Sequence, residues 1–201
     1  MSQTIQKENT AFFDAWAKSY DCFLFQFWMK HFHQGVLKVL DFSKPFTLLD
    51  VSCGTGELLN TIAKKSPKCK LSGMDFSQEM ISSAQRKNKN IYFQQGDVHK
   101  LSFKDNTFDY VISTTAFHHY HDQQKAMQEM TRVAKKGGSI IVSDIHFLLR
   151  LFNFLNEKLE PGCVHVNSGK EMKSLFEKVG LINIQQKRNF MFSMITLGIK
   201  N

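Results

Sequence analysis

The sequence is poor in cysteine and proline and lacks any long hydrophobic run. Among its 201 residues are three prolines and four cysteines, Cys22, Cys53, Cys69 and Cys163. No two cysteines form a Cys-x-x-Cys pair, so the spacing fits neither a zinc site nor a disulfide framework and predicts free thiols. No apolar run reaches the ~18 residues of a membrane span, and the polar first ten residues lack a signal-peptide core. We therefore expect a cytoplasmic protein.

The composition is that of an ordinary globular chain with a basic balance. Apolar residues make up 42% and charged residues 22%, so disorder is not expected, and the length suits a single domain. The formal net charge of +8 suits an anionic partner such as nucleic acid or a membrane surface. The cations lie in short scattered groups without a basic tail. Nucleic acid is therefore not the favoured partner, and peripheral membrane contact stays open.

The chain alternates short β-rich runs with helical stretches, which is typical of a parallel sheet covered by helices. We expect five strands of this kind, over Phe46–Val51, Lys70–Asp75, Ile91–Gln95, Phe108–Thr114 and Ser139–Asp144. Two last strands, Leu181–Lys187 and Phe190–Ile199, lie too close in sequence for a parallel crossover. The sequence therefore predicts an α/β fold whose seven-stranded sheet is mostly parallel with one antiparallel strand, and with helices on both faces.

Several residues mark the ends of the expected helices. Ser77 and Asp122 stand where N-caps belong, and Ser168 with Glu171 forms a capping box. A helix is expected from Asp122 to Lys136, with Gly137 at its C-cap.

The most informative motif is the turn that follows the first strand. The chain leaves this strand at an acidic residue and turns through Gly54 and Gly56 into a helix, so that a ligand can approach the backbone closely. Leu59 occupies the third glycine position of a dinucleotide motif, and Glu57 puts negative charge where a pyrophosphate would sit. Both features argue against NAD. They favour a ligand with no phosphate and a positive centre, such as S-adenosylmethionine.

Acidic residues also end the second and third strands. Asp75 follows the second glycine of the turn by 19 residues, where a carboxylate can accept both ribose hydroxyls. Asp97 can meet an adenine amino group, and Val98 offers apolar surface beside it. Two further side chains lie against the adenine or fill the core: Phe76 and Met80.

This ordered set resembles the class I S-adenosylmethionine-dependent methyltransferases of the Rossmann-like type. Within them it is similar to the branch that contains the ubiquinone and menaquinone C-methyltransferases. The resemblance covers about Phe12 to Asn201, and it is carried by Ala17–Asp21, Leu49–Gly56, Gly73–Ser77, Gly96–Asp97, Asp105–Val111, Phe117–Asp122 and Arg132–Gly138. It implies one domain, with a helical lid over 1–45, a cofactor-binding core over 46–144, and an acceptor-side segment with a terminal hairpin over 145–201.

The resemblance also implies an activity and roles for single residues. The activity is methyl transfer from S-adenosylmethionine to a small-molecule acceptor. The methionine part of the cofactor would be held by Asp50, Cys53, Gly54 and Thr55 of the glycine turn, and Ser52 and Gly56 of the same turn are also expected to bind the cofactor. Thr114 would line the sulfur side, and Tyr20 would close over the site. Ser52 departs from the family's usual glycine, so we expect weakened rather than lost binding.

A histidine cluster follows the fourth strand. Methyl transfer is an in-line displacement that needs a positioned nucleophile and a dry pocket, with a base only where the acceptor must lose a proton. His118 and His119, with Tyr20, are the candidates for catalytic groups. Together with His121 and Asp122 the two histidines could form a metal site, but we expect no metal there, since Asp122 serves better as a helix cap. The pair His31-x-His33 is expected on an exposed helix face.

The chain is unusually rich in phenylalanine, with nineteen, and two segments concentrate apolar residues. Residues Phe23–Met29 and Ile145–Leu155 flank the acceptor region of the family. They either pack into the core, bind a lipophilic acceptor or contact a membrane surface. Two other functions remain open, a non-catalytic S-adenosylmethionine-binding subunit and an RNA methyltransferase. Neither the acceptor, nor the atom that is methylated, nor the oligomeric state follows from the sequence.

Overall fold

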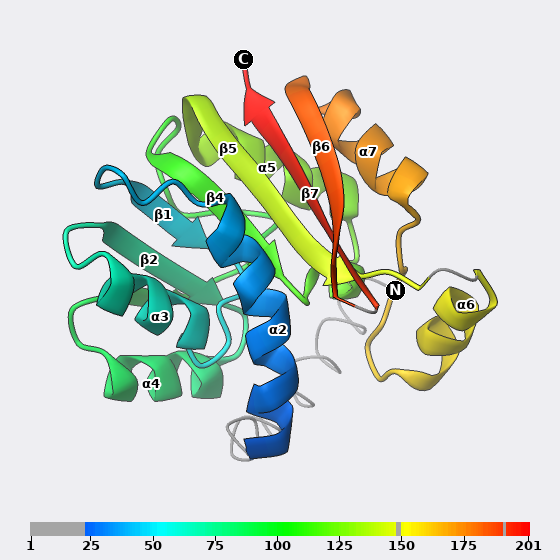
Figure 1. Ribbon diagram of the computed structural model, residues 1–201, viewed down its shortest axis with the longest axis horizontal. Helices are drawn as coiled ribbons and strands as arrows, with labels where there is room; N and C mark the ends of the chain where they lie inside the picture. Colours follow the sequence, from blue (N-terminus) through cyan, green and yellow to red (C-terminus); the bar gives the residue numbers. More distant parts are fainter. Residues whose placement is uncertain (1–22, 148–149, 191) are drawn as a thin grey trace.

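A single twisted sheet forms the centre of the protein (Figure 1). The computed structural model describes residues 23–147, 150–190 and 192–201. The strands are β1 (Thr47–Asp50), β2 (Lys70–Asp75), β3 (Tyr92–Gln95), β4 (Phe108–Thr114), β5 (Ala134–Ile145), β6 (Leu181–Phe190) and β7 (Ser193–Lys200). They lie in the order β3-β2-β1-β4-β5-β7-β6, and β7 runs antiparallel to both of its neighbours. The predicted fold class is confirmed.

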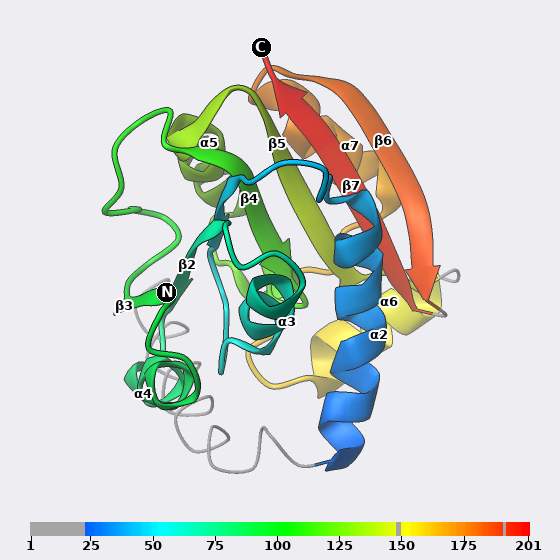
Figure 2. The same cartoon turned by 60° about the vertical axis from the view of Figure 1, so that its left-hand side comes forward.

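Helices cover both faces of the sheet. They are α2 (Phe23–Val39), α3 (Glu57–Lys65), α4 (Gln78–Lys87), α5 (Gln123–Val133), α6 (Arg150–Leu159) and α7 (Gly169–Lys178), with a short 3₁₀ turn, η1 (Phe117–His119). Helices α2, α3 and α4 lie on one face, and α5 and α7 lie on the other (Figures 1 and 2). Helix α6 lies beside the turn between β6 and β7. No helix within the described ranges is long and apolar enough to cross a membrane.

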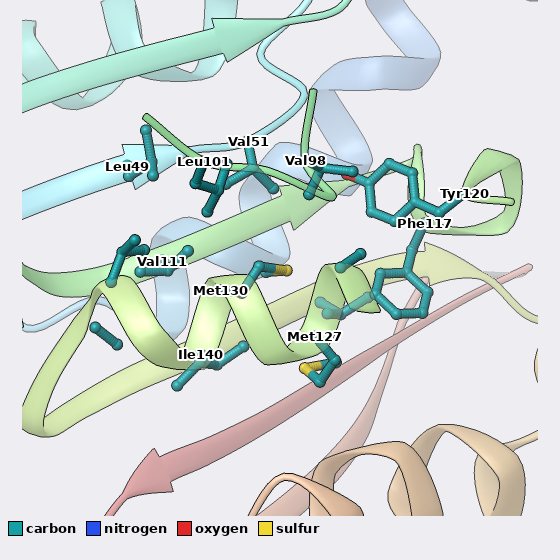
Figure 3. Close-up of a cluster of buried hydrophobic side chains, with 14 of the residues drawn as sticks. Leu49, Val51, Val98, Leu101, Val111, Phe117, Tyr120, Met127, Met130 and Ile140 are labelled. Carbon is teal, nitrogen blue, oxygen red and sulfur yellow. The ribbon is translucent and has the colours of Figure 1, made fainter. Parts of the chain in front are cut away.

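The core consists of two apolar clusters, one on each side of the sheet. Consecutive residues of β1 divide between them, since Leu48 packs with α2 and α3 while Leu49 packs with α5. Both leucines are fully buried, which explains why the strand reads as a continuous apolar run. Figure 3 shows the α5 cluster, in which Met127 and Met130 face the sheet and Tyr120 closes one end.

The predicted helix starts are confirmed by the hydrogen bonds of their caps. The Ser77 hydroxyl accepts from the Met80 amide at 3.1 Å, and the Asp122 carboxylate accepts from the Lys125 amide at 2.9 Å. Ser168 opens α7 in a complete capping box with Glu171. These caps satisfy amides that the first turn of a helix leaves without an intrahelical partner.

The end predicted for α5 is wrong. The helix stops at Val133, and the chain enters β5 at Ala134, which pairs with Phe108. The pairing with β4 then shifts, and the extra residues form a bulge that contains Gly137 at a φ of +75°. Glycine tolerates this left-handed backbone, so Gly137 serves a strand irregularity rather than a helix cap. The terminal strands also differ, as β6 runs on to Phe190 and β7 begins at Ser193.

Candidate functional site

A pocket lies at the carboxyl ends of the parallel strands, where the strand order reverses between β1 and β4. Open α/β sheets bind ligands at such a switch point. This strand-end pocket is lined by Val51, Ser52, Gly54, Asp75, Phe76, Met80, Gly96, Asp97, Val98, His99, Thr114, Thr115, Ala116, His119, Tyr120 and His121. Nine of the residues predicted to bind the cofactor or to act in catalysis are therefore brought together here.

The glycine turn is held to β2 by the side chain of Asp75. The Gly54 amide donates to Asp75 Oδ2 at 2.8 Å, and the Ser77 amide donates to Oδ1 at 3.0 Å. The Cys53 amide donates to the Met74 carbonyl at 2.9 Å. Gly54 has a φ of +51°, which side-chain-bearing residues rarely adopt. The turn and the acidic strand end thus form one connected unit.

Gly56 is the one predicted member of the turn that lines neither of the two pockets described here. It stands at the N-terminus of α3 with a φ of +78°. A Cβ atom at this position would lie 2.9 Å from the Phe93 ring, so the glycine permits close packing between the helix and the sheet. The structure places Gly56 against the core rather than in the lining of either pocket.

A second pocket, here called the helix-side pocket, lies between the glycine turn and α2. It is lined by Met29, His33, Asp50, Ser52, Cys53, Thr55, Glu57 and Thr114. Ser52 and Thr114 border both pockets, so the two cavities meet at these residues. Among the described residues, Thr114 Oγ1 is one of a few buried side-chain atoms with no hydrogen-bond partner. A hydroxyl left in this state at the junction fits a bound polar or charged group.

The expectation that His33 lies on an exposed face is wrong. The side chain borders the helix-side pocket, and burial lowers its pKa to about 4, which leaves the imidazole neutral. The sequence spacing could not reveal this contact, because it depends on how α2 docks across the ends of distant strands.

Asp50 carries unusual electrostatics for a carboxylate. It is 2% exposed, and burial, with the neighbouring charge of Asp75, raises its pKa to about 7. The Ser52 amide, which donates to Asp50 Oδ1 at 3.5 Å, lowers the pKa and so opposes this shift. An acid with this pKa is half-protonated near neutral pH. A cationic ligand bound beside it would favour loss of the proton and the charged form.

Ser52 is accommodated by a chain of hydroxyl groups. Its Oγ donates to the Val51 carbonyl at 2.8 Å and lies 2.6 Å from the Tyr120 hydroxyl, which lies 2.9 Å from Ser113 Oγ. Since Ser52 donates to Val51, Tyr120 donates to Ser52 and Ser113 donates to Tyr120. Ser52 is not among the described residues with a positive φ, so its backbone does not require glycine. Burial also raises the pKa of Tyr120 well above its ordinary range, which keeps the phenol a donor.

Polar side chains border the far end of the strand-end pocket. Asp97 Oδ1 accepts from the His99 amide at 2.9 Å and lies 2.5 Å from His99 Nδ1. The His99 ring stacks on His121, with centroids 3.8 Å apart. Phe76 and Met80 line the same cavity. The sequence suggested Asp97 and its neighbours but not His99, which the Asp97 loop carries into the site.

The two candidate catalytic histidines lie in different environments. His118 is 1% exposed and does not line the strand-end pocket; its Nδ1 lies 2.7 Å from Asp144 Oδ1. Burial opposes its charge, but Asp144 and Glu160 prevail and raise its pKa to about 10. His119 does line the pocket, and burial together with the charge of His118 lowers its pKa to about 4. Tyr20 lies outside the described residues.

Thr115 is a lining residue that sequence reasoning missed. It follows β4 with a φ of +51°, which is a rare conformation for a β-branched residue. Its hydroxyl donates to the Thr114 carbonyl at 2.8 Å, and its amide donates to the Ser143 carbonyl at 2.8 Å. Strained backbone of this kind clusters at binding sites, but nothing in the local sequence signals it.

Known proteins share both the sequence pattern and the architecture. Residues 42–184 match the family model described as a methyltransferase domain. This chain belongs to that methyltransferase family. A demethylmenaquinone methyltransferase of Bacillus licheniformis is 28% identical to this methyltransferase, over 78% of the chain and 79% of the relative. The chain is an enzyme that uses S-adenosylmethionine as its methyl donor.

Solved structures show the same fold in proteins of low sequence identity. An S-adenosylmethionine-dependent methyltransferase of Thermotoga maritima has a TM-score of 0.78 and 21% identity, covering 96% of this chain and 99% of that one. A Haloferax volcanii protein in complex with the Trm112 methyltransferase activator has a TM-score of 0.79 and 20% identity, covering 93% and 96%. At these identities the likeness extends to the fold alone.

Proposed function

We propose that this methyltransferase transfers the methyl group of S-adenosylmethionine to a small lipophilic acceptor bound beside His119. The observation that supports this most is the composition of the strand-end pocket. Its β1–β3 side holds the carboxylates of Asp75 and Asp97, and its β4 side holds His119 and Tyr120. Thr114 stands between the two sides and joins them to the helix-side pocket.

The donor set fits the adenosine part of the cofactor. Asp75 would accept from the ribose hydroxyls while the Gly54 and Ser77 amides hold its carboxylate in place. Asp97 would receive the adenine amino group, and Val98 offers apolar surface beside it. Phe76 and Met80 would cover the faces of the ring. Among the described residues, no basic side chain apart from the histidines lines the strand-end pocket, which suits a ligand without phosphate.

The helix-side pocket fits the methionine part. The carboxylate of Asp50 would face its ammonium group, since that of Glu57 is paired with Lys87 at 2.6 Å. The Thr55 and Thr114 hydroxyls would complete the polar contacts. Cys53 is buried, and burial raises the pKa of its thiol, so it would serve as uncharged lining. The bound cofactor supplies an electrophilic methyl group. The residues of this chain supply orientation and exclusion of water, which are the main needs of an in-line displacement.

The acceptor side is formed by His119 and the segment that follows α6. His119 Nδ1 lies 2.9 Å from the Gly162 carbonyl, so it donates there and fixes the ring beside the pocket. The Val164 and His165 amides donate to the His118 carbonyl at 2.8 and 3.1 Å, which ties the same segment to η1. We assign His119 to the wall of the acceptor site and His118 to the support behind it.

Exposed aromatic side chains near this segment support a lipophilic acceptor. On α6, Phe152 is 49% and Phe154 is 53% exposed, and Phe192 at the β6–β7 turn is 38% exposed. Phe147 packs between Phe152 and Phe192, with ring centroids 6.2 and 5.2 Å apart. The Bacillus licheniformis relative is named for demethylmenaquinone, and a quinol with an apolar tail would suit such a surface. Monomers seldom expose contiguous apolar patches without a function.

The proposal is tested by methyl-transfer assays with labelled S-adenosylmethionine and paired acceptors. We expect transfer to a hydroquinone that carries a prenyl tail, and a higher KM for the same ring without the tail. The double variant Phe152→Ser and Phe154→Ser should raise the KM for the tailed acceptor at least about five-fold, corresponding to ~1 kcal/mol of apolar contact. Tyr92→Ser is the matched control, because Tyr92 is an aromatic residue of β3 that is 57% exposed in the parent protein.

Two results would overturn the proposal. Equal turnover of tailed and tailless acceptors would contradict the proposal that the acceptor is lipophilic. Transfer to RNA but to none of the small molecules, with strong salt dependence, would support the RNA methyltransferase instead. Cofactor binding without transfer to any acceptor class would favour a non-catalytic subunit.

A further inference from the structure

Two histidines and a glutamate from distant parts of the chain meet beside the strand-end pocket. His118 and His119 belong to η1, and Glu160 directly follows α6. His118 Nε2 lies 3.4 Å from Glu160 Oε1, and His119 Nε2 lies 3.7 Å from the same oxygen. One ligand atom from each of the three residues lies within 4.8 Å of the others. Two imidazoles and a carboxylate are a donor set suited to a divalent transition metal.

The other nitrogen of each imidazole is already engaged by an acceptor. His118 Nδ1 lies 2.7 Å from Asp144 Oδ1, and His119 Nδ1 lies 2.9 Å from the Gly162 carbonyl. Histidines that bind metals usually donate their second ring N–H to a carboxylate or a backbone carbonyl, which sets the tautomer and leaves Nε2 for the ion. Both histidines show this arrangement, although they use two different kinds of acceptor.

We propose that His118, His119 and Glu160 bind one divalent transition metal ion, with Zn²⁺ the best match. Zinc bonds to nitrogen and oxygen of roughly 2.0–2.2 Å place neighbouring ligand atoms of a tetrahedron about 3.4 Å apart. The distances of 3.4 and 3.7 Å to Glu160 agree with this geometry. Three protein ligands leave a fourth position for water or substrate, as catalytic zinc sites do. Since His119 also lines the strand-end pocket, the ion would border the acceptor side.

This site differs from the cluster that the sequence suggested and for which no metal was expected. That cluster contained His121 and Asp122, but His121 stacks on His99 and Asp122 caps α5. Glu160, which lies 42 residues after His118 in the sequence, supplies the carboxylate of the proposed site instead. The alternative for the same geometry is an ion-pair network, in which a proton on His118 is held between Asp144 and Glu160.

Direct metal binding distinguishes the two. Protein treated with a chelator and then titrated with Zn²⁺ against a chromophoric competitor should bind one ion per chain, and Co²⁺ should give the absorption of a tetrahedral complex. Mg²⁺, which prefers oxygen ligands, should not compete. Glu160→Gln should weaken Zn²⁺ binding at least about 100-fold, and Asp144→Asn about 10- to 100-fold. Glu157→Gln is the matched control, because Glu157 lies one turn earlier on α6 and pairs with His165 instead.

Several outcomes would overturn the metal site. The first is a parent protein that binds no Zn²⁺ under these conditions, which leaves an ion-pair network only. The second is an equal loss of affinity in Glu160→Gln and Glu157→Gln, which would show adventitious binding elsewhere. If circular dichroism shows that Glu160→Gln is unfolded, His119→Asn supplies the same comparison. The titrations contain neither methyl donor nor acceptor, so their result is independent of the proposed function.

Discussion

The two sides of the strand-end pocket are built in different ways. The side that we propose binds the cofactor, here called the cofactor side, is formed by the ends of β1, β2 and β3. It relies on backbone amides and carboxylates within 21 residues of one another, as between Gly54 and Asp75. The side that we propose binds the acceptor, here called the acceptor side, is formed by η1 and the segment after α6. It relies on contacts between residues 26 to 43 positions apart, as between His118 and Asp144 or His119 and the Gly162 carbonyl. Short-range motifs thus make the first side, and the docking of distant segments makes the second.

This difference suits the two tasks that we propose, which are binding of a common cofactor and binding of a particular acceptor. A cofactor that is the same in every reaction can be held by a turn and its strand ends, whose geometry follows from the sheet. An acceptor that differs between enzymes is better met by a segment such as α6, which is placed on the scaffold by a few side-chain contacts. Four changes test how far the two sides are independent.

The largest effect is expected from His118→Asn, which breaks the acceptor side at its centre. His118 is 1% exposed, and its loss leaves the buried carboxylate of Asp144 without its partner. Removing one member of a buried pair typically costs about 3–5 kcal/mol of unfolding free energy. Urea denaturation of metal-free protein measures this. His165→Asn, which breaks a half-exposed pair with Glu157, is the control and should cost less than about 1 kcal/mol.

The next effect is expected from Asp75→Ala, which breaks the cofactor side. Loss of a carboxylate that accepts two hydroxyls should cost on the order of 1.5–3 kcal/mol, or roughly ten- to a hundred-fold in affinity for S-adenosylmethionine. Calorimetric titration measures it, with NAD as a ligand that should not bind. Glu79→Ala removes the same charge from an exposed position on α4. An affinity equal to that of Glu79→Ala would show that Asp75 only holds the glycine turn.

A pH series extends the comparison to the helix-side pocket, which is lined by Asp50 at the end of β1. The pKa of Asp50 is about 7 in the free protein and should fall when a cationic ligand binds beside the carboxylate. Binding then releases a proton, so affinity should rise with pH up to about 7, by at most about ten-fold per unit, and level off above. Asp50→Asn should remove this dependence and leave that of the cofactor's own amino group. Coincident curves for the two proteins would contradict the role of Asp50.

The smallest effect is expected from Thr115→Gly, at the boundary between the two sides. A left-handed backbone destabilises a residue with a side chain by about 1–2 kcal/mol, and substitution by glycine removes this strain. The greater flexibility of glycine in the unfolded chain lowers the stability by about 0.5–1 kcal/mol. The substitution should therefore raise the unfolding free energy by up to about 1 kcal/mol while loosening the pocket. Asn106→Gly, at a φ of +54°, is the control and should change less, because asparagine tolerates this conformation. A loss of stability in Thr115→Gly would show that its hydroxyl contacts outweigh the strain.

Local patterns were sufficient for the fold and for most of the cofactor side. The apolar run that ends at Asp50, the glycine turn and the acidic residues Asp75 and Asp97 are each readable within a few residues. Parallel strands present their carboxyl ends at one edge, so the sheet necessarily brings these groups together. The one departure there was Gly56, whose close contact with Phe93 depends on packing.

The sequence by itself therefore determined the order of the elements, the sheet, the helix caps and the glycine turn at the ends of the strands, since these depend on periodicity and on neighbours along the chain. Only the tertiary structure decided that His33 reaches a pocket, that His118 is buried against Asp144, and that Glu160 joins His118 and His119. These contacts depend on how α2 packs on the sheet, how η1 lies against β5 and how the segment after α6 lies against η1. Such packing is the sum of many weak interactions that no local pattern records.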